Sequence, residues 1–146
     1  MKTVPPNVEL LALAEVLESV MPRWIILPQA SRLTSTAWNG NARSTTGSTL
    51  IDMSSVFGSP SNVDAVLLRV AVRDSGSSGT HCYIRFDNAA PGGTSSAVNC
   101  PSVNDKWADQ QLTVPTNSDG DIYFDCVASG AGTLDVYVYV HGYHLR

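Results

Sequence analysis

The amino-acid sequence predicts a mostly β protein, an antiparallel β-sandwich or jelly roll with a short N-terminal α-helix. Three observations lead to this fold class. From Trp24 onward, apolar residues recur at every second position in short segments rich in β-branched and aromatic residues. Gly, Pro, Asn and Asp bound these segments at near-regular intervals. No helical pattern lies between the segments, which argues against the alternating strands and helices of a parallel sheet.

The expected helix covers residues 8–21, between Pro5, Pro6 and Pro22. Its apolar residues have the spacing of the a and d positions of two heptads, at Leu10, Leu13, Leu17 and Val20. Two heptads are too short to hold a coiled coil together in water, because helix nucleation is costly. We therefore expect this seam to dock, within its own subunit or between subunits. The chain divides into an N-terminal helical arm, residues 1–22, and a β-sandwich domain, residues 23–146.

The β domain is expected to contain about eight strands. They are placed at Trp24–Leu27, Thr34–Trp38, Arg43–Ile51, Ala65–Arg73, His81–Asp87, Gln111–Val114, Ile122–Val127 and Leu134–His141, with a shorter segment around Val98. Residues 34–38 and 43–51 are expected to form a hairpin through the turn Asn39-Gly40-Asn41. Residues 65–73 and 81–87 are expected to form a second hairpin. In the last strand, alternation points Val136, Val138 and Val140 inward and Tyr137, Tyr139 and His141 outward.

Charge and cysteine content exclude several classes of partner. The net charge is −4 and the sequence pI is about 5.1, so no positive field attracts nucleic acid or anionic lipid. No apolar stretch is long enough to span a membrane, and no signal peptide is recognised. We expect the chain to be made and kept in the cytosol unless a larger assembly carries it out. Cys82, Cys100 and Cys126 are odd in number and lack CxxC spacing, so buried free thiols are expected.

Motifs for catalysis, metal ions or cofactors are not found, and we expect a protein that is not an enzyme and needs no cofactor. His81, His141 and His144 stand beside no metal or nucleophile motif. Asn117, Asp119 and Asp121 resemble the start of a calcium loop, but the glycine and the glutamate that an EF-hand needs further on are missing. A hairpin turn is the better interpretation. Aspartates at strand ends, Asp74 among them, are expected to stabilise turns.

Aromatic residues are the strongest candidates for surface contacts. Tyr83, Tyr123, Tyr137 and Tyr139 all occupy the outward positions of their strands. Exposed aromatic side chains on a sheet mark either an interface or a platform on which sugars stack, although ordinary packing across the outer face is the alternative. A carbohydrate-binding sandwich would use Tyr137 and Tyr139, together with Trp107 or Trp38, as its stacking platform.

Three stretches carry a resemblance to a known class of proteins. They are Thr36-Ala37-Trp38-Asn39-Gly40, Ile51-Asp52-Met53-Ser54-Ser55-Val56-Phe57-Gly58 and the run from Ala65 to Ser77, with weaker matches at Asp121-Ile122-Tyr123 and His141-Gly142-Tyr143. Together they resemble the β-rich structural modules of tailed bacteriophages, chiefly over residues 33–77. The resemblance supplies no catalytic residues.

The resemblance implies a virion protein displayed on the particle surface. A head decoration (cement) protein, commonly a trimer that contacts the major capsid protein or other virion proteins, is the expectation. A tail-fibre or spike receptor-binding domain, with a host-surface glycan as its ligand, and a carbohydrate-binding β-sandwich are the alternatives.

Overall fold

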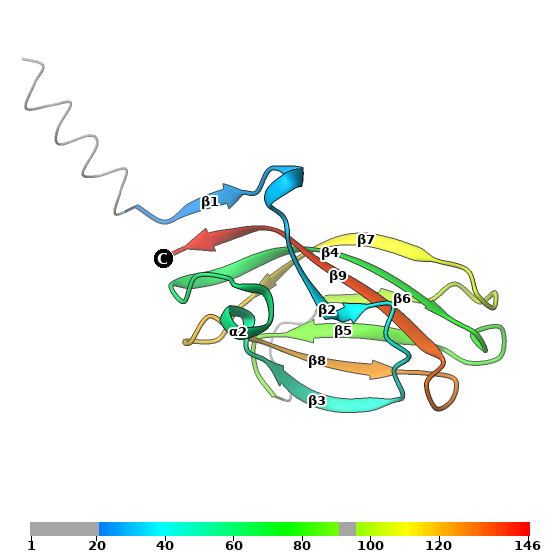
Figure 1. The fold of residues 1–146 in the computed structure, drawn as a ribbon. Helices are drawn as coiled ribbons and strands as arrows, with labels where there is room; N and C mark the ends of the chain where they lie inside the picture. The colour runs from blue at the N-terminus through cyan, green and yellow to red at the C-terminus, as the bar shows by residue number, and fades with distance from the viewer. Residues whose placement is uncertain (1–20, 91–95) are drawn as a thin grey trace, which may run out of the picture.

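Two antiparallel sheets packed face to face form the β domain (Figure 1). The computed structural model describes residues 21–90 and 96–146. The large sheet has the order β1-β9-β4-β7, and β2 also pairs with β9. Its strands are β1 (Arg23–Ile26), β2 (Leu33–Asn39), β4 (Val63–Asp74), β7 (Ala108–Pro115) and β9 (Leu134–Leu145). The small sheet has the order β3-β8-β5-β6, with β3 (Thr46–Ile51), β5 (Tyr83–Asp87), β6 (Ser96–Asn99) and β8 (Ile122–Val127).

Strands β2 to β9 have the connectivity of a jelly roll. They divide into the orders 2-9-4-7 and 3-8-5-6, and every connection between consecutive strands crosses from one sheet to the other, except that β5 and β6 pair directly. All the strand pairs are antiparallel. Double-sheet jelly rolls have this arrangement. The predicted fold class, an antiparallel sandwich or jelly roll, is therefore confirmed.

Both predicted hairpins are wrong. Strand β2 pairs with β9, while β3 pairs with β8 in the other sheet. Likewise β4 pairs with β7 and β9, while β5 pairs with β6 and β8. The physical reason is that alternation records which residues face the core, and two strands that follow each other can meet this demand equally well from opposite sheets.

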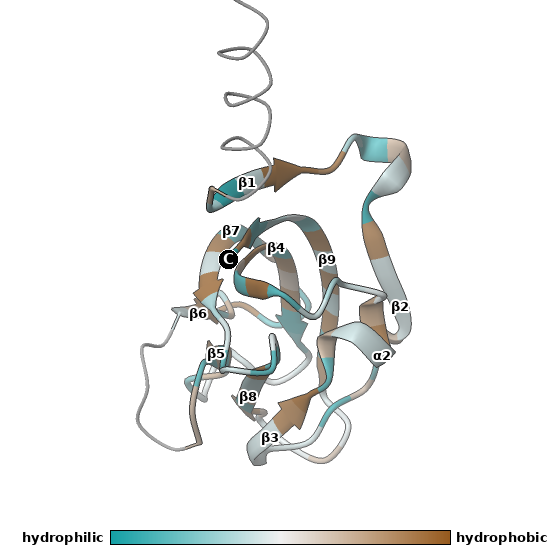
Figure 2. Ribbon diagram, turned by 90° about the vertical axis from the view of Figure 1, so that its left-hand side faces the viewer, coloured by the Kyte–Doolittle hydropathy of each residue, from teal (hydrophilic) through white to brown (hydrophobic). Residues whose placement is uncertain are grey.

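The hydrophobic core lies between the two sheets, and its residues follow the predicted alternation. In the large sheet, Val66, Leu68, Val70 and Val72 of β4 and Leu134, Val136, Val138 and Val140 of β9 are all fully buried. In the small sheet, the buried set includes Ile84, Phe86, Ile122 and Phe124. Figure 2 shows the alternation as hydrophobic and hydrophilic bands along the strands. Each such side chain contributes roughly 1.5 to 3 kcal/mol by leaving water.

Trp38 belongs to this core and is not a surface platform. Its side chain is 4% exposed, and its ring makes an edge-on contact with Phe124 at 4.8 Å between centroids. The guanidinium group of Arg43 lies over the same ring, 3.6 Å from its centroid. The expectation that Trp38 could stack against a sugar is therefore wrong, because β2 turns this position toward the small sheet.

The alternation of β9 breaks at His141, which was predicted to face outward and is 5% exposed. Leu68 pairs with Val140 and Leu67 pairs with Gly142, so His141 is an extra residue without a partner in β4. Such a β-bulge redirects the side chains around it. Gly142 is required beside it, because a Cβ atom there would lie 2.6 Å from the carbonyl oxygen of Ile25 in β1.

A short helix that the sequence interpretation missed connects β3 to β4. Helix α2 (Met53–Phe57) begins after Asp52, whose side chain accepts a hydrogen bond of 2.8 Å from the Ser55 amide. It ends at Gly58, whose φ of +74° places it in the left-handed region. Met53 and Phe57 of this helix are buried in the core. The capping pair of Asp52 and Gly58 was the available sequence signal.

Strand β1 confirms the first predicted strand and extends the large sheet along the end of β9. Trp24 and Ile26 in it are 44% and 62% exposed. A single turn of 3-10 helix, η1 (Gln29–Ser31), leads from β1 toward β2. The predicted helical arm, with Leu10, Leu13, Leu17 and Val20, lies outside the described residues.

Candidate interaction surface

The outer face of the large sheet carries three aromatic side chains side by side, which we call the aromatic row: Trp107, Tyr137 and Tyr139. The two tyrosine rings are nearly parallel, at 10°, with centroids 6.5 Å apart. Trp107 immediately precedes β7, and its ring lies 5.2 Å from that of Tyr137. Ala71 of β4 is the register partner of Tyr137. Its small side chain leaves room for the Trp107 ring to reach across β4.

An arginine paired with a carboxylate stands at each end of the aromatic row. Arg73 lies 5.0 Å from the Trp107 ring centroid, and its Nη2 donates to Asp135 Oδ2 at 2.8 Å. Arg69 lies 5.9 Å from the Tyr139 ring centroid, and its Nε is 3.0 Å from each carboxylate oxygen of Asp109.

The charges of Arg69, Asp109, Arg73 and Asp135 sum to zero. Each ion pair also restricts the side chains that form it. The hydrogen bonds from Arg69 to Asp109, and then the charge of that carboxylate, raise the pKa of Arg69. Each arginine sits against an aromatic ring and a carboxylate at once, which restricts its side chain before any partner arrives. A preorganised surface loses less conformational entropy when it binds.

The other two predicted tyrosines lie on the opposite side of the sandwich and do not form a row. Tyr83 in β5 faces Val127, and Tyr123 in β8 faces Asp87. The ion pair between Arg85 and Asp125 separates them along the same strand pair. All four tyrosines have the outward parity that the sequence predicts, but only Tyr137 and Tyr139 are brought together.

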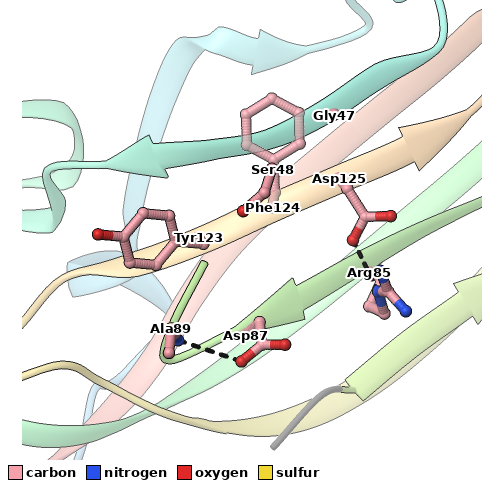
Figure 3. A pocket seen from close by; sticks show the side chains of 8 residues that line it. All are labelled: Gly47, Ser48, Arg85, Asp87, Ala89, Tyr123, Phe124 and Asp125. Atoms are coloured by element: carbon pink, nitrogen blue, oxygen red, sulfur yellow. Dashed lines mark hydrogen bonds and ion pairs between the residues drawn. The ribbon is translucent and has the colours of Figure 1, made fainter. Parts of the chain in front are cut away.

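A hollow of about 210 Å³ opens on the small sheet (Figure 3). It is lined by Gly47, Ser48, Arg85, Asp87, Ala89, Tyr123, Phe124 and Asp125. Arg85 Nε donates to Asp125 Oδ1 at 2.7 Å, and Asp87 accepts from the Ala89 amide at 3.1 Å. The charged groups of this hollow therefore already have partners within the chain, so they offer no unpaired charge to a ligand.

Metal and catalytic sites were not predicted. Within residues 21–90 and 96–146, no cluster of three or more histidine, cysteine, aspartate or glutamate side chains is placed to hold a metal ion. Asn117 uses its side-chain oxygen to accept the amides of Asp119 and Asp121, both at 2.9 Å. The calcium-like stretch is therefore a turn. No helix in the described part of the chain has the length and apolar character needed to cross a membrane.

Cys82, Cys100 and Cys126 are free and buried, as expected. Burial raises the pKa of all three thiols, that of Cys100 to about 12. A thiol that stays protonated at neutral pH is a poor nucleophile and a poor metal ligand. These cysteines act as small core residues.

Asp74 stabilises the turn after β4, as the sequence predicts, by accepting the Gly76 amide, and it is also a fully buried carboxylate. It accepts hydrogen bonds from the Gly76 amide at 2.7 Å, the Ser129 amide at 3.0 Å and the Thr133 hydroxyl at 2.9 Å, and one from the Ser129 hydroxyl. These bonds tie the loop after β4 to the loop before β9. No local pattern separates Asp74 from the other strand-end aspartates, because only the Gly76 amide is near it in the sequence, whereas its donors on Ser129 and Thr133 come from more than fifty positions away.

Comparisons with known proteins do not assign this chain to a family. No protein-family model matches the chain, and no curated protein sequence matches it significantly. Among solved structures, the coat protein of Tobacco streak virus is similar, with a TM-score of 0.42 and 8% sequence identity, over 100% of this chain and 90% of that chain. At this TM-score and identity, the similarity carries no argument about function.

Proposed function

We propose that this chain is a non-enzymatic structural protein of a virus particle, in particular a trimeric capsid decoration (cement) protein of a tailed bacteriophage. The observation that carries the proposal is the aromatic row between two arginine–carboxylate pairs. Its charges neutralise one another, so Trp107, Tyr137 and Tyr139 supply the uncharged contact surface between the two pairs. Trp, Tyr and Arg are the residues most enriched at the energetic centres of protein interfaces.

Further support for an assembling subunit comes from the start of the β domain. Trp24 and Ile26 expose large apolar side chains on β1, directly after the arm that carries the predicted heptad seam. Soluble monomers rarely leave contiguous apolar surface uncovered. A trimer joined through this region would leave the aromatic row free to contact the major capsid protein or other virion proteins.

The location on a phage particle rests on the resemblance over residues 33–77, which become β2, β3, α2, β4 and the start of the following loop. The fold is compatible with it, since jelly rolls are common in viral capsid proteins and in lectins. A fold alone does not decide function. The side chains on the surface must therefore distinguish a capsid protein from a lectin.

A second candidate function is glycan binding, as a tail-fibre or spike receptor-binding domain or as a carbohydrate-binding sandwich. It is favoured by Trp107, which is 38% exposed and inclined at 45° to Tyr137. Exposed aromatic rings of this kind can stack against the apolar face of a sugar.

The proposed function is tested with the full-length protein. Sedimentation at micromolar concentration is expected to give three times the 15.6 kDa of the chain, and labelled protein is expected to coat intact phage heads in electron micrographs. Tyr137→Ser should reduce coating, whereas the matched variant Tyr83→Ser, on the opposite sheet, should not. A stable monomer would rule out the trimer, and equal coating by both variants would remove the aromatic row from the interface.

A further inference from the structure

A second hollow, of about 240 Å³, lies at the Tyr139 end of the aromatic row. Its lining comes from four parts of the chain: Gln29 and Arg32 around η1, Thr34 of β2, Arg69 of β4, and Tyr139 and His141 of β9. Tyr139 is the register partner of both Thr34 and Arg69, which places it at the centre of this wall. The hollow is therefore built on the large sheet itself.

The hollow carries uncompensated positive charge. Among the described residues Arg32 forms no hydrogen bond or ion pair, and its Nε atom is buried without a partner. Arg69 shares its charge with Asp109, but no carboxylate lines the hollow. In a chain with a net charge of −4, Arg32 is therefore the charge at this hollow that no carboxylate balances.

His141 lies in the wall of this hollow with one ring nitrogen unused. Its Nδ1 is 3.4 Å from the amide nitrogen of Gln111, which can only donate. The imidazole proton therefore belongs on Nε2, and Nε2 is buried with no hydrogen-bond partner. Burial, and then the charges of Arg32 and Arg69, lower the pKa of His141, while Asp109 opposes them. A buried donor without an acceptor is costly in a folded protein unless a ligand or a water completes it.

These features describe a site for an anion attached to a polar ring. Arg32 and Arg69 offer charge-assisted hydrogen bonds to a carboxylate. Gln29 and Thr34 offer an amide and a hydroxyl, which match sugar hydroxyl groups, and Tyr139 offers an aromatic face. The volume is below the roughly 300 to 1,000 Å³ of sites for drug-sized ligands, and so fits a single ring.

We propose that this hollow binds one residue of an acidic saccharide, a hexuronic or sialic acid, with its carboxylate at Arg32 and Arg69 and its ring against Tyr139. This site goes beyond the proposed role in assembly. Tyr139 supplies the contact with the sugar ring, and Arg32 supplies the selectivity for acid.

The test titrates full-length protein with glucuronate, N-acetylneuraminate and methyl glucoside at constant ionic strength, by calorimetry or NMR. The two acids are expected to bind and the neutral sugar is not. Arg32→Gln should weaken acid binding about tenfold, the loss of one charge-assisted hydrogen bond. Arg32→Lys should restore part of it. Arg85→Gln, on the opposite sheet, is the matched control and should change nothing.

A second readout follows the ring nitrogens of His141 by NMR. The groups that face this ring are Arg32 beside η1, Arg69 on β4, and Asp109 and Gln111 on β7. The free protein should show the proton on Nε2, and acid binding should shift that resonance and raise the pKa of His141. Binding that leaves His141 unchanged would place the sugar elsewhere.

Three results would overturn the proposal. Equal binding of acidic and neutral sugars would leave only an aromatic platform. Binding of a glutamate-rich peptide in place of either acid would make the hollow a protein contact. Absence of acid binding by a correctly folded trimer would remove the site and leave the proposed assembly role intact.

Discussion

Two regions of the large sheet hold carboxylates in opposite ways. At the end of β4, Asp74 is fully buried and has only uncharged donors, two amides and two hydroxyls. On the outer face, Asp109 and Asp135 each face an arginine, and their side chains remain 40% and 23% exposed. The difference indicates that Asp74 holds the fold together, whereas the ion pairs shape the surface.

Solvent explains why the two regions differ in energy. Water screens the exposed pairs, so each contributes about 0 to 1 kcal/mol. Around Asp74 the donors replace water entirely. Burial raises the pKa of Asp74, but the hydrogen bonds from Ser129, Gly76 and Thr133 outweigh burial, so the pKa lies below its ordinary value. A carboxylate in such a setting is stable only while all its donors stay in place.

The largest effect is expected from a carboxylate placed where no donors exist. Val70 is fully buried between the sheets, so Val70→Asp should lower the free energy of unfolding by several kcal/mol or prevent folding. Chemical denaturation monitored by tryptophan fluorescence measures this. If Val70→Asp proved as stable as the parent, donors would matter less than we infer from Asp74.

Removal of Asp74 itself is expected to have the next largest effect. Asp74→Ala leaves buried donors unpaired and should cost about 3 kcal/mol or more. The control is Asp135→Ala, which should cost about 1 kcal/mol or less because its arginine can turn to water. Equal losses in the two variants, measured by the same denaturation, would erase the distinction between the regions.

Acid should expose the same difference with a smaller effect. The pKa of Asp74 is lower in the folded state than in the unfolded state, so its contribution is fully present above the unfolded value of about 3.9. It is lost as pH falls toward the folded pKa. Stability measured between pH 7 and pH 3 should therefore decline less steeply in Asp74→Asn than in the parent. Parallel profiles would show that Asp74 does not titrate differently on unfolding.

The smallest effect is expected from Arg69→Ala. It removes one surface ion pair and one contact with the Tyr139 ring, so the stability should change by about 1 kcal/mol or less. The effect should shrink further in high salt, which screens exposed charges. A loss of several kcal/mol in a thermal melt would show that the outer face supports the fold directly.

The same contrast explains what sequence could and could not predict. Alternation placed Val70 inside and Tyr137 outside, because side-chain parity is a local property of a strand. Alternation could not predict the contact between Trp107 and Tyr137, because that contact depends on which strands pair and in which register. It failed at His141 because a bulge inserts one residue. The glycine that follows, Gly142, was the available local signal for this bulge. Three of the four donors to Asp74 could not be predicted for a related reason: they belong to Ser129 and Thr133, which lie in another loop.

The pairing of β1 with β9 has a mechanical consequence. Arg23 lies opposite Leu145, and Ile26 lies opposite Gly142, so both ends of the β domain leave from the same end of one antiparallel pair. Tension between the arm and the C-terminus therefore loads these hydrogen bonds one after another, beginning at Arg23, in the geometry of a zipper. Such a pair opens at low force. At the same end Leu145 pairs with Val63, and the Arg146 amide donates to the Asn62 carbonyl at 2.9 Å, so tension on the C-terminus also loads the start of β4. A tethered subunit would therefore yield first at this corner of the large sheet.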